Sequence, residues 1–220
     1  CCKEGILPEN CYCVRLYRTT YEGERLVNTT QVNYVDPLDR KQILEADQEL
    51  RHQMNIITDF LRKYVPGYEH CTIKTGASTL GIRESRRFSG KYVMNISDLR
   101  EARRFPDVVV HKAQFVVDIH NPVGGGQANG IAEYVDAYDI PWRSLVPQKM
   151  ENLILAGRCI SGTHEAMASY RVMAIAMAIG EAAGIGAALA IDHDVTPENL
   201  DVKYIQKALM DKGAVLFDEK

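Results

Sequence analysis

Residues 153–174 read LILAGRCISGTHEAMASYRVMA, and this stretch decides the fold class of the 220-residue chain. Its first four residues form a short apolar run that ends at Gly157, as a buried strand of a parallel sheet does. A polar loop should follow, and the Ala- and Gly-rich run over 172–191 then predicts a long helix. A strand, a loop and a helix in this order predict an α/β fold, of the mixed α+β kind.

The polar loop is the first candidate for a binding site. It would lie at the carboxyl end of the predicted strand, where open α/β sheets bind ligands. The loop carries four polar residues, Arg158, Ser161, His164 and Glu165. We expect the helix to begin within one or two residues of Arg171 and to run to about Ala190, so that free N–H groups of its first turn face the same crevice. The alternative is a structural corner in which His164 and Glu165 only cap the helix.

The composition is that of an ordinary soluble globular protein. The chain is 46% hydrophobic and 25% charged, with a formal net charge of -3 and a pI of about 6.1. It has no basic excess that would indicate binding to nucleic acid or to an anionic membrane. The run over 172–191 contains Glu181, consists largely of Ala and Gly and lacks flanking aromatic belts, so we interpret it as a helix packed on a sheet.

The chain opens with the residues CCKE, without an initiator Met or a signal peptide. We therefore expect a cytoplasmic protein and a cut inside a longer chain. Six cysteines occur, Cys1, Cys2, Cys11, Cys13, Cys71 and Cys159. The spacing of Cys11 and Cys13 is shorter than structural zinc sites prefer and no matching second pair follows, so we expect reduced thiols and no metal site.

Other elements follow from local patterns. Residues 11–35 should form two extended segments around a polar turn at 21–24. Asp36-Pro37 predicts the start of a helix that runs to about Tyr64 and stops at Pro66-Gly67. Further predictions are a short helix over 98–104, strands at 108–110 and 115–117, and a final helix from Thr196-Pro197-Glu198 to Lys212-Gly213.

Four segments together resemble the C-terminal part of FAD-dependent oxidoreductases of the glutathione-reductase type, the superfamily that includes fumarate reductase flavoproteins. Their bacterial members are the most similar. The matching segments are Gly81–Arg87, Asp118–Pro122, Tyr138–Pro147 and the stretch Asn152–Ala166, which continues through Arg171–Met173 and Glu181–Gly184. They stand in the family's order between about residues 80 and 190. Any one segment alone would be a weak match, and the four in order are specific.

The resemblance implies FAD as the cofactor and assigns residues to it. Gly157 and Arg158 would approach the ribityl chain, while Arg171, Val172 and Met173 would face the isoalloxazine ring. Ser161 and Glu165, on the loop between these positions, join them as candidate cofactor-binding residues. The electrostatics agree, because a helix N-terminus and an arginine both stabilise the anion of a reduced flavin.

Catalytic and substrate-binding candidates lie outside the helix corner as well. Arg83 and Arg86 either hold an anionic substrate by bidentate hydrogen bonds or belong to a structural network with Glu84. His120, two residues after Asp118, either moves a proton during hydride transfer or is a buried, hydrogen-bonded histidine. His120, Arg86 and His164 are the candidate catalytic residues. Gly124-Gly125-Gly126-Gln127 is interpreted as a flexible loop.

A complete flavoprotein of this type also contains a Gly-x-Gly-x-x-Gly segment, which this chain lacks. We therefore expect residues 1–147 to be a β-rich part of the substrate domain and residues 148–220 to be the last strand and C-terminal helix of the FAD-binding domain. The missing N-terminal FAD-binding segment would be its partner. The predicted activity is hydride transfer between a small organic substrate and flavin. The alternative is a non-catalytic binding module or subunit. The sequence leaves open whether the protein forms a homo-oligomer.

Overall fold

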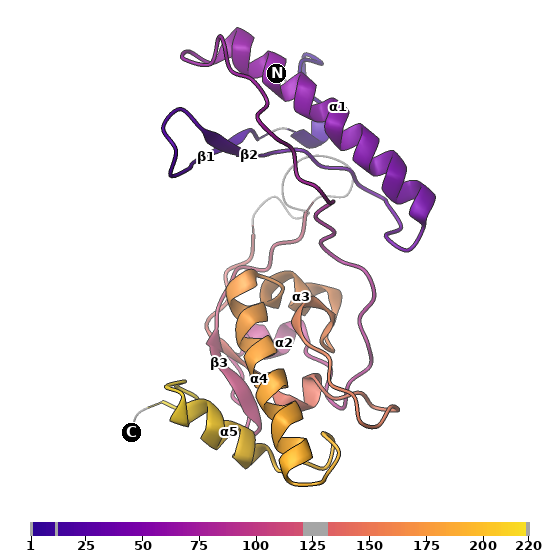
Figure 1. Ribbon diagram of the computed structural model, residues 1–220, viewed down its shortest axis with the longest axis vertical. Coiled ribbons are helices and arrows are strands. Elements are labelled where there is room, and N and C mark those ends of the chain that lie inside the picture. Colours follow the sequence, from indigo (N-terminus) through magenta and orange to yellow (C-terminus); the bar gives the residue numbers. More distant parts are fainter. Residues whose placement is uncertain (1, 12, 121–131, 219–220) are drawn as a thin grey trace. The chain divides into compact units, whose positions relative to one another are not determined.

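The computed structural model describes residues 2–11, 13–120 and 132–218. Two compact units make up the chain (Figure 1). The first comprises Cys1–Ser85 and His120–Ile131, and the second Arg86–Ile119 and Ala132–Lys220. The described residues form helices and two small antiparallel sheets, which confirms the mixed α/β class. The domain boundary predicted after residue 147 stays a prediction.

The first unit packs a hairpin and an N-terminal turn against one long helix. A short 3-10 helix, η1 (Glu9–Cys11), precedes strands β1 (Arg15–Arg18) and β2 (Arg25–Asn28), which pair antiparallel as the sequence predicts. The long helix is α1 (Arg40–Tyr64). Its residues Ile57 and Leu61 form a small core with Leu7 and Cys11.

Helix α1 begins later than predicted. Asp36 and Pro37 lie in a turn, and Asp39 is the N-cap. The Asp39 carboxylate accepts the N–H groups of Lys41 and Gln42 at 2.8 and 3.4 Å, so it satisfies two of the free donors of the first turn. The predicted C-terminal end of α1 is confirmed, because the helix ends at Tyr64 and its C-cap Val65 directly precedes Pro66-Gly67.

The second unit contains the remaining elements. They are α2 (Ile96–Arg100), β3 (Val108–Ala113), β4 (Tyr138–Pro141), η2 (Trp142–Ser144), η3 (Gly157–Cys159), α3 (His164–Tyr170), α4 (Met173–Asp192) and α5 (Val202–Asp211). β3 and β4 pair antiparallel, and α4 and α5 both pack on β3 (Figure 1). Strand β3 begins where the sequence predicts a strand, at Val108. Helix α2 overlaps the predicted helix over 98–104 only at residues 98–100, because it begins two residues earlier and ends at Arg100. Residues 115–117 form only an isolated bridge from Val117 to Glu133.

Three predictions in the C-terminal part are corrected. Residues 153–156 form no strand in the described chain, since Leu155 N donates to Leu145 O at 3.0 Å but no neighbouring strand pairs with the segment. The predicted polar loop contains η3 and α3. The final helix begins at Val202 and not near Thr196, because residues 196–199 form a turn and Asp201 is the N-cap.

Helix α4 itself begins and ends as predicted, and its small residues have a clear packing reason on one face. A Cβ added at Gly186 would collide with the ring of Trp142 and would lie 3.1 Å from Ile205 Cδ1. Two residues earlier in the chain, Gly184 has nothing within 4 Å of such a Cβ. The helix can therefore approach η2 and α5 closely only because position 186 carries no side chain.

The two glycines give a matched test of this packing. We expect Gly186→Ala to lower the free energy of unfolding by about 1–3 kcal/mol through overpacking. Gly184→Ala should raise it by about 0.5–1 kcal/mol, since alanine is the better helix former at an open position. Urea unfolding followed by circular dichroism measures both. Equal effects of the two substitutions would contradict the packing of α4 against Trp142.

Candidate functional site

Ser161 attaches the segment 157–163 to three other segments of the chain through hydrogen bonds. Ser161 is fully buried. Its N–H donates to Ser144 O at 2.9 Å, its carbonyl accepts Met94 N at 3.1 Å, and its hydroxyl accepts Gly90 N at 2.9 Å. All three kinds of polar atom in Ser161 are thus satisfied by three different segments. The fixed loop in turn positions Arg158 and the start of α3.

Further anchors surround Ser161, and sequence reasoning missed them. Arg87 Nε donates to Gly162 O at 2.8 Å, and the Tyr170 hydroxyl donates to Ile160 O at 3.1 Å. Thr163 N donates to Met94 O at 2.8 Å. Met94 lies in a stretch without a motif, so only its place in the fold shows that it pairs with the loop.

Gly157 has the conformation expected where a backbone turns sharply. Its φ is +76°, in the left-handed region that disfavours side chains, and nothing lies within 4 Å of the position that a Cβ would take. Arg158 follows in η3 and is exposed. The two residues predicted to approach the ribityl chain therefore lie on an open part of the second unit.

Helix α3 occupies the part of the loop that carries His164 and Glu165. Thr163 is the N-cap, and its hydroxyl accepts Ala166 N at 3.4 Å. His164 and Glu165 are the first two residues of the helix, and both are exposed. The backbone N–H of Glu165 and the Thr163 side chain lower the pKa of the Glu165 carboxyl, so it is an anion at neutral pH.

The first turn of α4 is open. Val172 is its N-cap and contributes no side-chain hydrogen bond, while Met173 is 83% exposed. Arg171, between α3 and α4, donates through Nη2 to Asp118 O at 2.8 Å and to Asp118 Oδ2 at 3.2 Å. Asp118 thus holds the guanidinium of the residue that directly precedes the N-cap of α4, and partial positive charge gathers at such an uncapped helix N-terminus.

A buried hydroxyl pair joins α3 to the segment before Asp118. The hydroxyls of Tyr138 and Ser169 lie 2.8 Å apart, and Ser169 donates to Phe115 O at 2.6 Å. Burial raises the pKa of Tyr138 to about 12, so its hydroxyl stays neutral at physiological pH. The pair therefore has a positioning role for α3 and needs no change of charge.

The family model for FAD dependent oxidoreductases matches residues 2–209. The chain belongs to this family. Membership indicates a flavin-linked redox function. The match also extends the resemblance seen in residues 80–190 to almost the whole chain. Comparisons with curated proteins and with solved structures give no match.

The predicted catalytic and substrate-binding residues belong to different units. Arg83 and His120 lie in the first unit, and Arg86 and His164 in the second. Arg83, Arg86 and His164 are exposed, and His120 is partly buried. Their roles stay predictions. Residues 124–127, interpreted as a flexible loop, lie outside the described residues.

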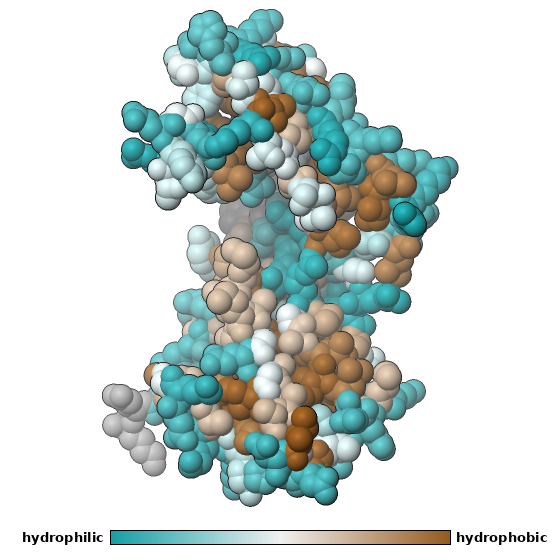
Figure 2. Space-filling model, in the orientation of Figure 1, coloured by the Kyte–Doolittle hydropathy of each residue, from teal (hydrophilic) through white to brown (hydrophobic). Residues whose placement is uncertain are grey.

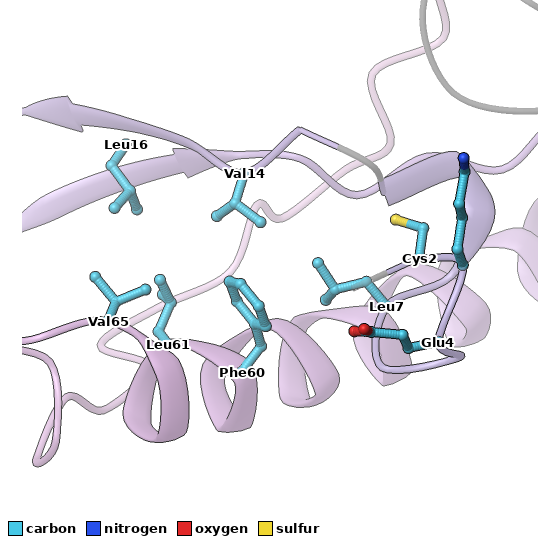
Figure 3. Close-up of a pocket in the computed structure, with 9 residues that line it drawn as sticks. Cys2, Glu4, Leu7, Val14, Leu16, Phe60, Leu61 and Val65 are labelled. Carbon is cyan, nitrogen blue, oxygen red and sulfur yellow. The ribbon is translucent and has the colours of Figure 1, made fainter.

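One cavity lies within the first unit, and none of the predicted site residues line it. It measures about 750 Å³ and lies between β1 and α1 (Figure 3). Apolar side chains such as Leu16, Phe60 and Leu61 line most of it, with Cys2 and Glu4 at one end. Within the described ranges, no group of three His, Cys, Asp or Glu residues is arranged to hold a metal ion.

The anchoring role of Ser161 can be tested through stability. Ser161→Ala leaves the buried N–H of Gly90 without its acceptor, so we expect a loss of about 1–3 kcal/mol in the free energy of unfolding. Ser89→Ala changes a serine of the neighbouring segment whose side chain makes no such anchor, and it should stay within about 0.5 kcal/mol of the parent. Similar values for the two variants in urea unfolding would contradict the anchor.

Proposed function

We propose that this chain supplies the ring-facing side of a flavin site in an enzyme that transfers hydride between a small organic substrate and FAD. The observation that carries the proposal is the uncapped N-terminus of α4, with Arg171 beside it, in a member of this family. A bound flavin would supply the two-electron chemistry. The family match supports the cofactor, and the geometry of the second unit supports the placement.

The residues present fit the cofactor in kind. Reduced flavin is commonly an anion, and the N–H groups at Met173 and Ala174 lie in the first turn of a 20-residue helix. Gly157 adds a backbone position with open space around it. Arg158, Ser161 and Glu165 complete the proposed cofactor-binding set with Arg171, Val172 and Met173. Ser161 would act by holding the loop, since its hydroxyl is engaged with Gly90.

The pyrophosphate and adenosine of FAD need other residues, because the chain contains no Gly-x-Gly-x-x-Gly segment. We propose that a further polypeptide segment, N-terminal in the complete flavoprotein, provides them. Two features support a partner at the second unit. Residues 153–156 are only partly buried, and α4 is apolar but largely uncovered.

The uncovered face of α4 is continuous. Figure 2 shows brown, apolar atoms at the surface of the second unit. On α4, Met173, Met177 and Ile191 are 83%, 74% and 81% exposed. Gly180 and Gly184 have open space beside them. Among the described helices, α4 is the one whose length and mean hydropathy of 1.9 would allow a membrane span. We propose instead that the FAD-binding segment covers this face, because glycines permit close approach of a packed sheet.

The remaining roles belong to the same proposal. Arg83 and Arg86 would bind an anionic group of the substrate, and His120, Arg86 and His164 would assist proton transfer. We place the protein in the cytoplasm, without a nucleic-acid or membrane partner. The alternative function is a non-catalytic binding module or subunit, and a native start codon just before Cys1 would support it.

The charge beside the α4 N-terminus can be tested in the flavin-loaded protein, expressed from the coding sequence extended upstream of Cys1. Arg171→Ala should lower the two-electron reduction potential of the flavin by about 30 mV, which corresponds to ~1.4 kcal/mol. Asp118→Asn should raise it, since the anion that pairs with Arg171 is removed. Potentials are read spectroscopically against reference dyes. Unchanged potentials in both variants would reject Arg171 as an electrostatic partner of the flavin.

An absorbance spectrum tests whether FAD binding requires a further segment besides this chain. We expect the 220-residue chain to purify without stoichiometric flavin, since the residues that would hold the pyrophosphate are not among its own. The absorbance of oxidised flavin at about 450 nm measures this. Stoichiometric flavin on the 220 residues alone would contradict this requirement, while leaving the family assignment intact.

A further inference from the structure

Strand β3 brings two consecutive side chains to one carboxylate. In a regular strand, neighbouring side chains point to opposite faces. Here the pairing of β3 with β4 shifts register between Val110 and Ala113, and Lys112 has a φ of +53° in the left-handed region. His111 and Lys112 consequently both reach Asp218 in the C-terminal segment. The bulge re-aims one side chain, as bulges commonly do.

The imidazole of His111 is enclosed on its other side by an ion pair. His111 is 4% exposed at its side chain, and its Nδ1 lies 2.9 Å from Asp139 Oδ1 on β4. Arg104 Nη1 lies 3.0 Å from the same oxygen, and Lys112 N donates to it at 3.3 Å. Asp139 is thus held as an acceptor, which assigns a proton to Nδ1 of His111.

This assignment leaves the second ring nitrogen with an unfavourable neighbour. His111 Nε2 is buried without a hydrogen-bond partner among the described residues, and it lies 3.6 Å from Asp218 Oδ1. In neutral His111, a lone pair at Nε2 faces a carboxylate oxygen. In protonated His111, the same atom is an N–H donor aimed at that oxygen. A movement of a few tenths of an ångström would then form a charge-assisted hydrogen bond.

We propose that His111 is a proton-operated clasp, which fastens the end of the C-terminal segment, residues 214–218, to β3 when Nε2 is protonated. Leu216, 3% exposed in the core, and the Lys112–Asp218 pair hold the segment in both states. The charged groups that face the ring are Asp139 with Arg104 on one side and Asp218 with Lys112 on the other. Protonation therefore decides how firmly residues 217 and 218 are held.

The state of Asp218 supports the clasp. The ammonium of Lys112 lowers the pKa of the Asp218 carboxyl, and His111 contributes to the same shift. The Asp218 side chain is consequently held as a carboxylate, the form that accepts hydrogen bonds. The Asp218 carboxylate is therefore available as an acceptor when Nε2 of His111 carries a proton.

The test measures the backbone order of Phe217 by ¹⁵N relaxation in the 220-residue chain at about pH 5.5 and at about pH 7.5. We expect the order parameter to rise at the lower pH toward the value of about 0.85 that is typical of rigid backbone. His111→Asn keeps an N–H for Asp139 but cannot take up a proton, so the dependence on pH should disappear. His193→Asn, which removes an exposed histidine stacked on Tyr204, should retain it.

Two results would overturn the clasp. One is equal order of Phe217 at both pH values in the parent chain, and the other is an unchanged pH dependence in His111→Asn. Should His111→Asn fail to fold, Asp218→Ala provides the same test at a side chain that is 56% exposed. Its retention of the pH dependence would also reject the proposal. None of these outcomes depends on flavin binding.

Discussion

The second unit depends on the complete hydrogen bonding of one buried serine. Ser161 joins the segments at Gly90, Met94 and Ser144, which are far from it in the sequence. A buried N–H or C=O without a partner is costly, so the three segments can move only together. Gly90 allows the approach, because a Cβ there would lie 2.7 Å from the Ser161 Cβ. The positions of Arg158, of α3 and of the Arg171 corner all follow from this anchored loop.

Helix α4 has two faces with different requirements. On the inner face, Gly186 lies against Trp142 and any added atom meets an aromatic ring. On the outer face, Gly180 and Gly184 face open space and the exposed residues are apolar. Small residues on the inner face are explained by packing within the unit. Those on the outer face have no such explanation there, which is why we propose that a further segment of the flavoprotein covers them.

The charged residues discussed in the second unit form two separate groups. Arg171 and Asp118 lie before its N-terminus, where the helix dipole favours anions and where we place the flavin ring. His111, Asp139 and Asp218 lie around β3, with their own cations Arg104 and Lys112. The first arrangement has an open helix end, and the second a buried ring nitrogen. They consequently suit different tasks, cofactor electrostatics in one case and attachment of the C-terminal segment in the other.

The sequence by itself predicted what depends on local chemistry. The small apolar run from Val172 predicted α4, the hairpin followed from its polar turn, and four ordered motifs predicted the family that the match over residues 2–209 establishes. It failed where local signals compete or where an element needs a neighbour. Asp36 and Asp39 are both good caps, and the fold uses Asp39 because that residue binds two free N–H groups.

Residues 153–156 show the limit most clearly, since an apolar run becomes a strand only when another strand lies beside it. Only the tertiary structure could pair Ser161 with Gly90 and Met94, Arg171 with Asp118, and His111 with Asp139 and Asp218. These pairs join residues that are distant along the chain. Propensity and periodicity describe neighbours in sequence, whereas the satisfaction of buried polar groups is decided by which segments the fold brings together.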